Sequence, residues 1–334
     1  MTKLICAPMA TLSTEAFRRS VESFGGCDEY FTEMINASSL LNMGPWEKYY
    51  LMNEVCPEKI VWQLTGNNGD KLAQAVPVVC EKGGIGVDLN MGCSAPQIYK
   101  TGAGISWMTK PLKETEDAVK KVKRALEKVS SEQNKNFRLS VKCRLGNEDF
   151  TTESLFDFVQ MLTDNGVELV TLHPRTIKEK YRGLPKYEYA EELALKFPQT
   201  VFYLNGCIKD NASLSYAMEK SPSSKGMMIA RQAAAAPWIF AQLKKQLHSQ
   251  GSSYEKITVD RKQTALNFIS DITECQPQEF FKTRIQRFFN YYCQQFSFGH
   301  WFQSLMLNYK SVEDSKEKVE AYFEKVPQDR FLEI

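Results

Sequence analysis

The chain has 334 residues, of which 43% are hydrophobic and 25% are charged, and its formal net charge is +2. This composition is typical of a globular protein, and no apolar run approaches the roughly 20 residues of a membrane span, so the sequence predicts no membrane-spanning helix. A net charge of +2 is too small to indicate a polyanionic partner, so any binding of nucleic acid has to depend on local basic patches.

The first residues and the cysteines both bear on the compartment. Residues 1–8 lead directly into a strand-like run, without the apolar segment and small-residue cleavage site of a signal peptide. The nine cysteines are scattered and contain no Cys-x-x-Cys pair, which argues against a disulfide framework and against a zinc knuckle. We therefore expect reduced thiols and a cytoplasmic protein.

Strand-like apolar runs alternate with helix-patterned segments over most of the chain. The clearest helix lies between the fourth and fifth runs, where residues 112–129 carry apolar side chains at helical spacing. Eight such units with short connections predict an α/β fold of the (β/α)8 TIM-barrel type. The eight runs cover residues 4–9, 30–35, 60–64, 85–89, 139–143, 169–173, 201–204 and 226–229.

The alternation ends after residues 237–240, which we expect to open the last barrel helix. Residues 249–253, Ser-Gln-Gly-Ser-Ser, are typical of a linker. From residue 257 onward the pattern is helical and contains no convincing strand. The sequence therefore predicts a TIM-barrel domain over residues 1–248, followed by an α-helical bundle over residues 254–334 that is large enough for a small core. We expect the protein to be a monomer.

The ends of the eight runs are unusually polar, and in barrels of this type the catalytic groups lie at the C-terminal ends of the strands. Amide, cationic and imidazole groups on one rim suit an anionic, heteroaromatic ligand, and flavin mononucleotide (FMN) meets that description. The residues at these ends, in chain order, are Pro8, Met9, Ala10, Gln63, Asn90, Cys93, Lys142, Arg144, His173, Arg175, Asn205, Gly206, Cys207, Ala230 and Arg231.

Several of these residues also have a purely structural interpretation. Gln63 and Asn205 could cap turns, His173 could be a satisfied interior imidazole, and Lys142 could extend from the barrel mouth into solvent. Arg231 precedes the final barrel helix, in the region where barrels often build a phosphate site, and could meet a phosphate there.

Taken together, the motifs resemble those of the dihydrouridine synthases, through their order and spacing. The resemblance spans the barrel and continues more loosely into the helical tail. It implies an FMN-dependent barrel with a helical RNA-recognition domain, which reduces the carbon 5–carbon 6 double bond of a uridine in RNA, normally tRNA, with NADPH as the electron donor. The motifs are Ala-Pro-Met-Ala at 7–10, Gln-Leu at 63–64, Asn-Met-Gly-Cys at 90–93, Lys-Cys-Arg-Leu-Gly at 142–146, His-Pro-Arg at 173–175, Asn-Gly at 205–206 and Ala-Arg at 230–231.

The resemblance also implies roles for individual positions. Residues 8–10, Gln63 and Lys142 would contact the flavin ring, with His173 near it, while residues 205–207 and 230–231 would hold the ribityl phosphate. The chain departs from the family at Cys207, where an acidic or small residue is common, and at Ala230, which replaces a frequent glycine.

Cys93 matches the general acid, which would protonate carbon 5 of the uracil after hydride has reached carbon 6. A thiol suits this task, because its ordinary pKa of about 8.5 keeps most of it protonated near neutrality. Asn90, Arg175 or Arg182 could hydrogen-bond the uracil edge.

Three alternatives remain open. An FMN barrel acting on a free small molecule, of the dihydroorotate or ene-reductase type, would not need the helical extension. A non-catalytic RNA-binding barrel would not need Gln63, Lys142, Cys93 and Arg231 together. A metal site from Cys143, His173 and Cys207 matches no zinc template in its spacing.

The helical tail interleaves basic and aromatic residues. Such a mixture suits phosphate neutralisation and base stacking, so we expect the tail to hold tRNA or another structured RNA. The alternative is that the aromatic residues form the core of the bundle and the cations its solvated face. The residues concerned are Phe281, Lys282, Arg284, Arg287, Phe288 and Phe289.

Overall fold

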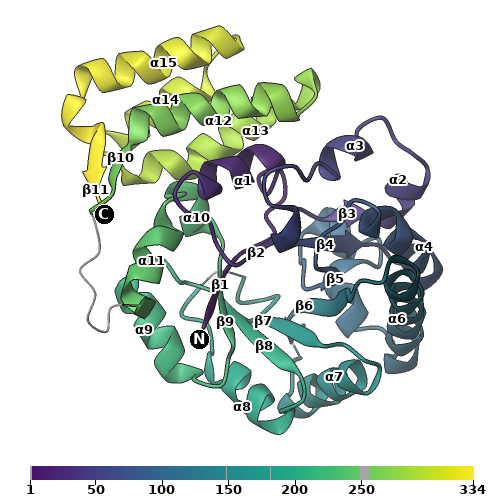
Figure 1. Cartoon of the computed structure of the whole chain (residues 1–334). Coiled ribbons are helices and arrows are strands. Elements are labelled where there is room, and N and C mark those ends of the chain that lie inside the picture. Colours follow the sequence, from purple (N-terminus) through teal and green to yellow (C-terminus); the bar gives the residue numbers. More distant parts are fainter. Residues whose placement is uncertain (1, 148, 181, 249–255) are drawn as a thin grey trace.

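The computed structural model describes residues 2–147, 149–180, 182–248 and 256–334. Eight parallel strands form a closed ring, because β2 pairs with β1 on one side and with β4 on the other. Helices surround this ring (Figure 1), so the predicted TIM barrel is confirmed. The barrel strands are β1 (Lys3–Cys6), β2 (Glu29–Phe31), β4 (Ile60–Thr65), β5 (Gly86–Met91), β6 (Arg138–Gly146), β7 (Leu169–Thr176), β8 (Val201–Asn205) and β9 (Gly226–Ile229).

The second predicted strand is divided in two. The run at residues 30–35 ends as β2 at Phe31, and β3 (Ile35–Asn36) forms a separate short pairing with the end of β4. The division has a local cause, since Thr32 Oγ1 accepts a hydrogen bond from the Gln63 N–H at 3.0 Å. A side chain thus occupies the place of a backbone carbonyl in the ladder, and residues 32–34 are not part of a strand.

Several helices around the barrel begin at polar capping side chains. Thr14, Asn68, Thr151 and Asp210 each accept a hydrogen bond from a backbone N–H of the first turn that follows them. The predicted helix at residues 112–129 is confirmed and extends to Gln133. These helices are α1 (Glu15–Glu22), α2 (Ala37–Leu41), α3 (Glu47–Tyr50), α4 (Gly69–Cys80), α5 (Pro96–Tyr99), α6 (Leu112–Gln133), α7 (Thr152–Asp164), α8 (Glu188–Lys196), α9 (Asn211–Lys220), α10 (Arg231–Ala235) and α11 (Ile239–His248), with 3-10 turns at Pro57–Lys59 and Gly104–Met108.

A charged cluster closes the barrel at the N-terminal ends of the strands. Glu29 is 1% exposed and accepts hydrogen bonds from Arg138 (2.7 Å), Lys3 (2.8 Å) and the Tyr203 hydroxyl (2.8 Å). Burial alone would raise the pKa of Glu29, but the hydrogen bonds and the Arg138 charge outweigh it and lower that pKa. This end of a barrel serves stability, so the chemistry is expected at the other end.

The tail folds into four helices and a small two-stranded sheet. The prediction of no strand after residue 257 was wrong, because β10 (Thr258–Asp260) pairs antiparallel with β11 (Phe331–Glu333). Three-residue strands are too short to show an alternating pattern in the sequence. The predicted linker at residues 249–253 lies outside the described residues. The helices are α12 (Arg261–Cys275), α13 (Gln278–Tyr292), α14 (Gly299–Leu307) and α15 (Val312–Lys325), with 3-10 turns at Cys293–Gln295 and Pro327–Asp329.

Aromatic side chains form the core of this helical region. The rings of Phe268 and Phe288 stack with centroids 3.7 Å apart, and those of Phe302 and Tyr322 stack at 4.2 Å. Phe288 and Phe289 are both fully buried. The prediction that these two residues stack on RNA bases was therefore wrong, and the alternative of an aromatic bundle core is correct for them. Within the described ranges, no helix has the length and apolar character needed to cross a membrane.

The helical region packs against α1 and α10 of the barrel (Figure 1). A buried ion pair joins the two, with Arg284 Nη1 on α13 lying 2.7 Å from Glu33 Oε1. Arg284 is 2% exposed and Glu33 is 5% exposed. The other Glu33 oxygen accepts the Thr11 N–H at 2.7 Å, in the loop that follows β1. The expectation that Arg284 contacts RNA was therefore wrong, since its guanidinium is enclosed between the two regions.

We predict that Arg284→Met lowers the free energy of unfolding by about 3 kcal/mol or more, because it leaves the Glu33 carboxylate buried without a counter-charge. Denaturant unfolding followed by circular dichroism measures the change. Arg287→Met, at an exposed position of the same helix, is the matched control and should unfold like the wild type. Equal stability of the two variants would show that the ion pair contributes nothing to holding the regions together.

Candidate active site

The C-terminal ends of the barrel strands bring most of the predicted residues to one rim. The strand register places Gln63 beside Asp88, Asn90 beside Lys142, and Arg144 beside His173. Residues from runs that are far apart in the sequence are thus neighbours, because all eight parallel strands point the same way.

A chain of hydrogen bonds runs from the barrel interior to the loop that carries the thiol. Asp88 accepts from Ser140 Oγ at 2.8 Å and from Gln63 Nε2 at 2.7 Å. Gln63 Oε1 accepts from Asn90 Nδ2 at 2.9 Å, and Asn90 Oδ1 accepts from the Cys93 N–H at 2.9 Å. Burial raises the pKa of Asp88 to about 6, although its hydrogen bonds oppose the shift.

Cys93 is half-buried in the loop that follows β5. Its carbonyl accepts the Ile105 N–H at 3.0 Å, and Arg144 Nε donates to the neighbouring Gly92 carbonyl at 3.0 Å. Gly104 has φ +61°, and a Cβ there would lie 2.5 Å from the Cys93 carbonyl oxygen, so only glycine fits. Cys93 and Cys207 are the partly exposed thiols, and the other seven cysteines are buried. The loop therefore holds an accessible thiol in a fixed place.

Four cationic side chains surround His173. Burial lowers the pKa of His173, and the charges of Arg144, Lys142, Arg175 and Arg231 lower it further. Burial and the Arg144 charge likewise lower the pKa of Lys142 to about 8. Arg175 Nη1 lies 3.1 Å from His173 Nε2, and because a guanidinium can only donate, this nitrogen is the acceptor of a neutral imidazole. The rim thus combines high positive potential with a neutral histidine.

The end of β8 approaches this cluster closely. Asn205 Oδ1 accepts from Lys142 Nζ at 3.1 Å, and Asn205 Nδ2 donates to the Met228 carbonyl at 2.8 Å. Gly206 has φ +138°, and a Cβ there would lie 3.2 Å from His173 Cδ2. Cys207 follows with φ +53°, and its sulfur accepts from Arg175 Nη2 at 3.2 Å. A side chain at residue 206 would therefore collide with Pro185 and His173, and glycine allows this close packing.

The first and last predicted segments lie at the same rim. Ser13 holds the loop after β1, since its hydroxyl accepts from the Met9 N–H and donates to the Ala7 carbonyl. Pro8 and Met9 are half-buried and Ala10 is exposed. Ala230 is half-buried and Arg231 is exposed at the start of α10.

Two predicted uracil contacts differ in their surroundings. Arg182 is exposed on the loop after β7, and its backbone N–H donates to Glu179 O at 2.8 Å. Arg175, in contrast, is 1% exposed and its guanidinium is engaged by His173, Gly183 and Cys207. Arg175 is thus a buried residue that connects β7 to residues 183 and 207 beneath the rim.

The sequence interpretation missed Asp88 as part of this site. Its signal was a carboxylate within the otherwise apolar run Gly-Val-Asp-Leu at residues 86–89. The metal alternative gains no support, because no three His, Cys, Asp or Glu side chains in the described part of the chain come together as a metal site.

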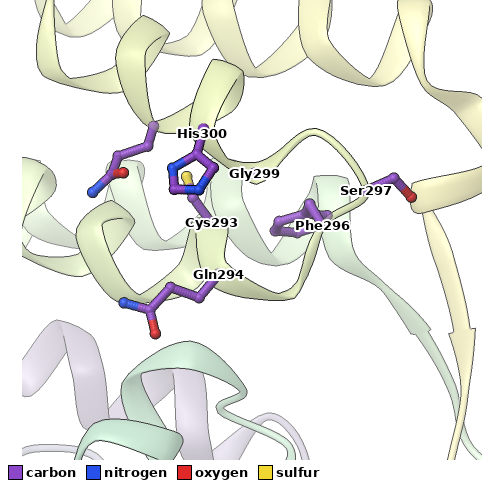
Figure 2. Close-up of a pocket in the computed structure, with 7 residues that line it drawn as sticks. Cys293, Gln294, Phe296, Ser297, Gly299 and His300 are labelled. Carbon is purple, nitrogen blue, oxygen red and sulfur yellow. The ribbon is translucent and has the colours of Figure 1, made fainter.

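A hollow of about 230 Å³ lies in the helical region, apart from the barrel rim (Figure 2). It contains none of the predicted site residues and no charged Lys, Arg, Asp or Glu side chain. Its lining consists of Cys293, Gln294, Phe296, Ser297, Gly299, His300 and Gln303.

Comparison with known proteins agrees with the resemblance seen in the sequence. The family model described as dihydrouridine synthase (Dus) matches residues 5–327. A protein of Aquifex aeolicus named as a probable tRNA-dihydrouridine synthase is 31% identical over 250 residues, which are 72% of each chain. A human protein named as a tRNA-dihydrouridine(47) synthase is 29% identical over 260 residues, which are 78% of this chain and 38% of that protein. The chain thus spans well under half of the human relative.

Among solved structures, morphinone reductase in complex with tetrahydroNAD superposes with a TM-score of 0.50 at 10% sequence identity. The superposition covers 73% of this chain and 86% of that chain. At this identity the likeness concerns the fold alone.

His173 gives a prediction for the pH dependence of stability. Its folded pKa is lowered, so below about pH 6.5 the unfolded chain binds a proton that the native protein does not, and stability falls as the pH falls. From about pH 7.5 to pH 5.5 this group should remove about 1.4 kcal/mol from the free energy of unfolding. His173→Gln keeps an acceptor for Arg175 and should lose less stability than the wild type over this interval. Parallel losses would contradict a neutral His173.

Proposed function

The chain belongs to the dihydrouridine synthase family, and on that premise we propose that it reduces a uridine of tRNA to 5,6-dihydrouridine, with FMN at the barrel rim and NADPH as the electron donor. One observation carries the proposal: the accessible Cys93 thiol is fixed by Asn90 and Arg144 at the same rim as the cationic cluster around His173. An acid beside an anion-binding surface is what such a reduction needs.

The residues at the rim fit FMN by their chemistry. Lys142, Arg144 and Arg231 supply positive potential for a phosphate and for an electron-rich ring. Gly206 lets the end of β8 pack closely against His173 and Pro185, which places residues 205–207 at the rim. Arg175 Nε is buried and has no hydrogen-bond partner among the described residues, so one N–H donor at this site lacks an acceptor.

In this proposal the flavin ring is held by the backbone of Pro8, Met9 and Ala10 and by Gln63 and Lys142, with His173 beside it. Asn205, Gly206, Cys207, Ala230 and Arg231 hold the phosphate. Bound FMN would take electrons from NADPH and deliver hydride to carbon 6 of the uracil.

Cys93 then acts as the general acid, and its thiol gives a proton to carbon 5. Asn90 donates one of its two amide hydrogens to Gln63, so the other is available for a uracil carbonyl, and Arg182 can reach the base from the exposed loop. His173 stays neutral and does not compete as an acid, because burial and its cationic neighbours hold its pKa low.

We also propose that the helical region is a separate domain, residues 254–334, that recognises RNA beside a catalytic domain over residues 1–248. A base within folded RNA must be unstacked to reach the barrel rim, at a cost of a few kcal/mol, so a second RNA-holding surface is needed. The exposed cations Lys282 and Arg287 on α13 support this assignment, and Arg287 lies over the ring of Tyr291 at 5.2 Å. The proposal takes the protein to be a cytoplasmic monomer.

The test of the catalytic proposal separates the two half-reactions. The purified protein should be yellow, and Cys93→Ala should lower the rate of uridine reduction by about 100-fold or more, because it removes the general acid. Reduction of the flavin by NADPH, followed by stopped-flow absorbance, should keep its wild-type rate. Cys80→Ala removes a thiol at the last residue of α4, away from the strand ends that form the rim, and is the control. A colourless protein that takes up no FMN, or equal loss in both half-reactions, would refute the proposal.

The test of RNA binding uses the double variant Lys282→Glu/Arg287→Glu. Its affinity for tRNA should fall, and the slope of log K against log salt should become less steep by about 2, because two phosphate contacts are lost. The FMN content should not change. Lys128→Glu, at a 77% exposed side chain on α6, is the control. Wild-type affinity and salt slope in the double variant would assign both cations to the solvated face.

A further inference from the structure

Asp88 lies in the barrel interior and touches neither the thiol nor the proposed ligands. We infer that Asp88 is a positioning residue, which acts through the amides of Gln63 and Asn90 to fix the loop that carries Cys93. The task of the thiol comes from the proposed function, whereas the hydrogen bonds that hold the loop are features of the structure.

The order of the hydrogen bonds follows from the carboxylate. An ionised carboxylate only accepts hydrogen bonds, so it determines which end of an amide faces it. Asp88 Oδ2 accepts from Gln63 Nε2, which turns Gln63 Oε1 toward Asn90. That oxygen accepts a hydrogen bond from Asn90 Nδ2. Asn90 Oδ1 therefore faces the loop, where it accepts the N–H groups of Gly92 and Cys93 at 3.3 and 2.9 Å. Each amide therefore has one orientation, set from the Asp88 end.

Burial makes this order rigid. Gln63, Asp88 and Ser140 lie side by side on β4, β5 and β6, and all three are 0% exposed. Ser140 Oγ holds the second Asp88 oxygen at 2.8 Å. Inversion of either amide would place acceptor against acceptor in a buried medium of low dielectric.

A carboxylate as deeply buried as Asp88 lowers the stability of the barrel if it serves only to fill the core. The interior layers of TIM barrels are normally filled by branched apolar side chains, and burial of a charge lowers stability unless its partners compensate. Other residues that point into the barrel, such as Val61, Leu169 and Met228, are apolar. Glu29, the carboxylate near the opposite end of the barrel, is compensated by Arg138 and Lys3, whereas a role in orienting Gln63 and Asn90 accounts for Asp88.

The experiment measures the reactivity of Cys93 in the full-length protein. Asp88→Asn keeps the size of the side chain but can also donate, so Gln63 and Asn90 lose their fixed orientation. Iodoacetamide labelling at about pH 7.5, quantified on the Cys93 peptide by mass spectrometry, should become about three- to tenfold faster, as expected when one hydrogen bond to the loop is lost. Thr171→Val is the control, because it removes a fully buried hydroxyl of the barrel interior that has no hydrogen-bond partner within the described residues. In this variant Cys93 should be labelled at the wild-type rate.

A double-mutant cycle tests whether the effect passes through the amides. Asn90→Ala alone should also raise labelling, and addition of Asp88→Asn to it should cause no further rise, because the path is already cut. Additive effects, or wild-type labelling in a folded Asp88→Asn protein, would overturn the inference. If Asp88→Asn does not fold, Gln63→Met interrupts the same path and is judged by the same cycle.

The same variants separate this inference from the proposed function. Uridine reduction per bound FMN should fall in Asp88→Asn, whatever FMN content the reoriented Gln63 leaves. If the wild type itself does not reduce uridine, the proposed function fails, yet the labelling rates still decide the role of Asp88.

Discussion

Closure of the barrel is the constraint on which the site depends. The ring closes where the short strand β2 pairs with β4 through Tyr30–Ile60 and Phe31–Val61. Because all eight strands are parallel, closure brings their C-terminal ends into one circle, and residues from seven segments meet there. The cluster around Glu29 braces the opposite end. The polar rim and the charged cluster around Glu29 thus lie at opposite ends of the barrel.

Burial then determines the electrostatics of the rim. Within the cylinder, the same loss of solvent raises the pKa of Asp88 and lowers those of Lys142 and His173. Burial and the cations around His173 keep the imidazole neutral, and the proposed function therefore assigns the protonation step at this rim to the thiol of Cys93. Asn90 Oδ1 accepts the N–H groups of Gly92 and Cys93, Arg144 Nε donates to the Gly92 carbonyl, and these hydrogen bonds hold the loop that carries Cys93.

Glu33 connects this rim to the helical region. One carboxylate oxygen pairs with Arg284 of α13, and the other holds the Thr11 N–H in the loop that follows β1. Thr11 has φ +63°, an unfavourable value for a side chain with a branched Cβ, which the hydrogen bond to Glu33 helps to maintain. The buried Glu33 carboxylate therefore stabilises both the position of the helical region and the conformation of the loop after β1.

The sequence by itself determined the barrel, the chain order of the polar strand ends and the helix at residues 112–129, because apolar periodicity and the residues that follow each run are local features. It also placed Cys93 after the fourth run, whereas the role of candidate acid came from the resemblance to the dihydrouridine synthases. Only the tertiary structure decided the partner of Arg284, which lies 251 residues away at Glu33, the pairing of β10 with β11, and the burial of Phe288 and Phe289. It also decided the place of Asp88, since its partners come from two neighbouring strands. These contacts depend on which distant segments meet, and neither spacing nor composition encodes that locally.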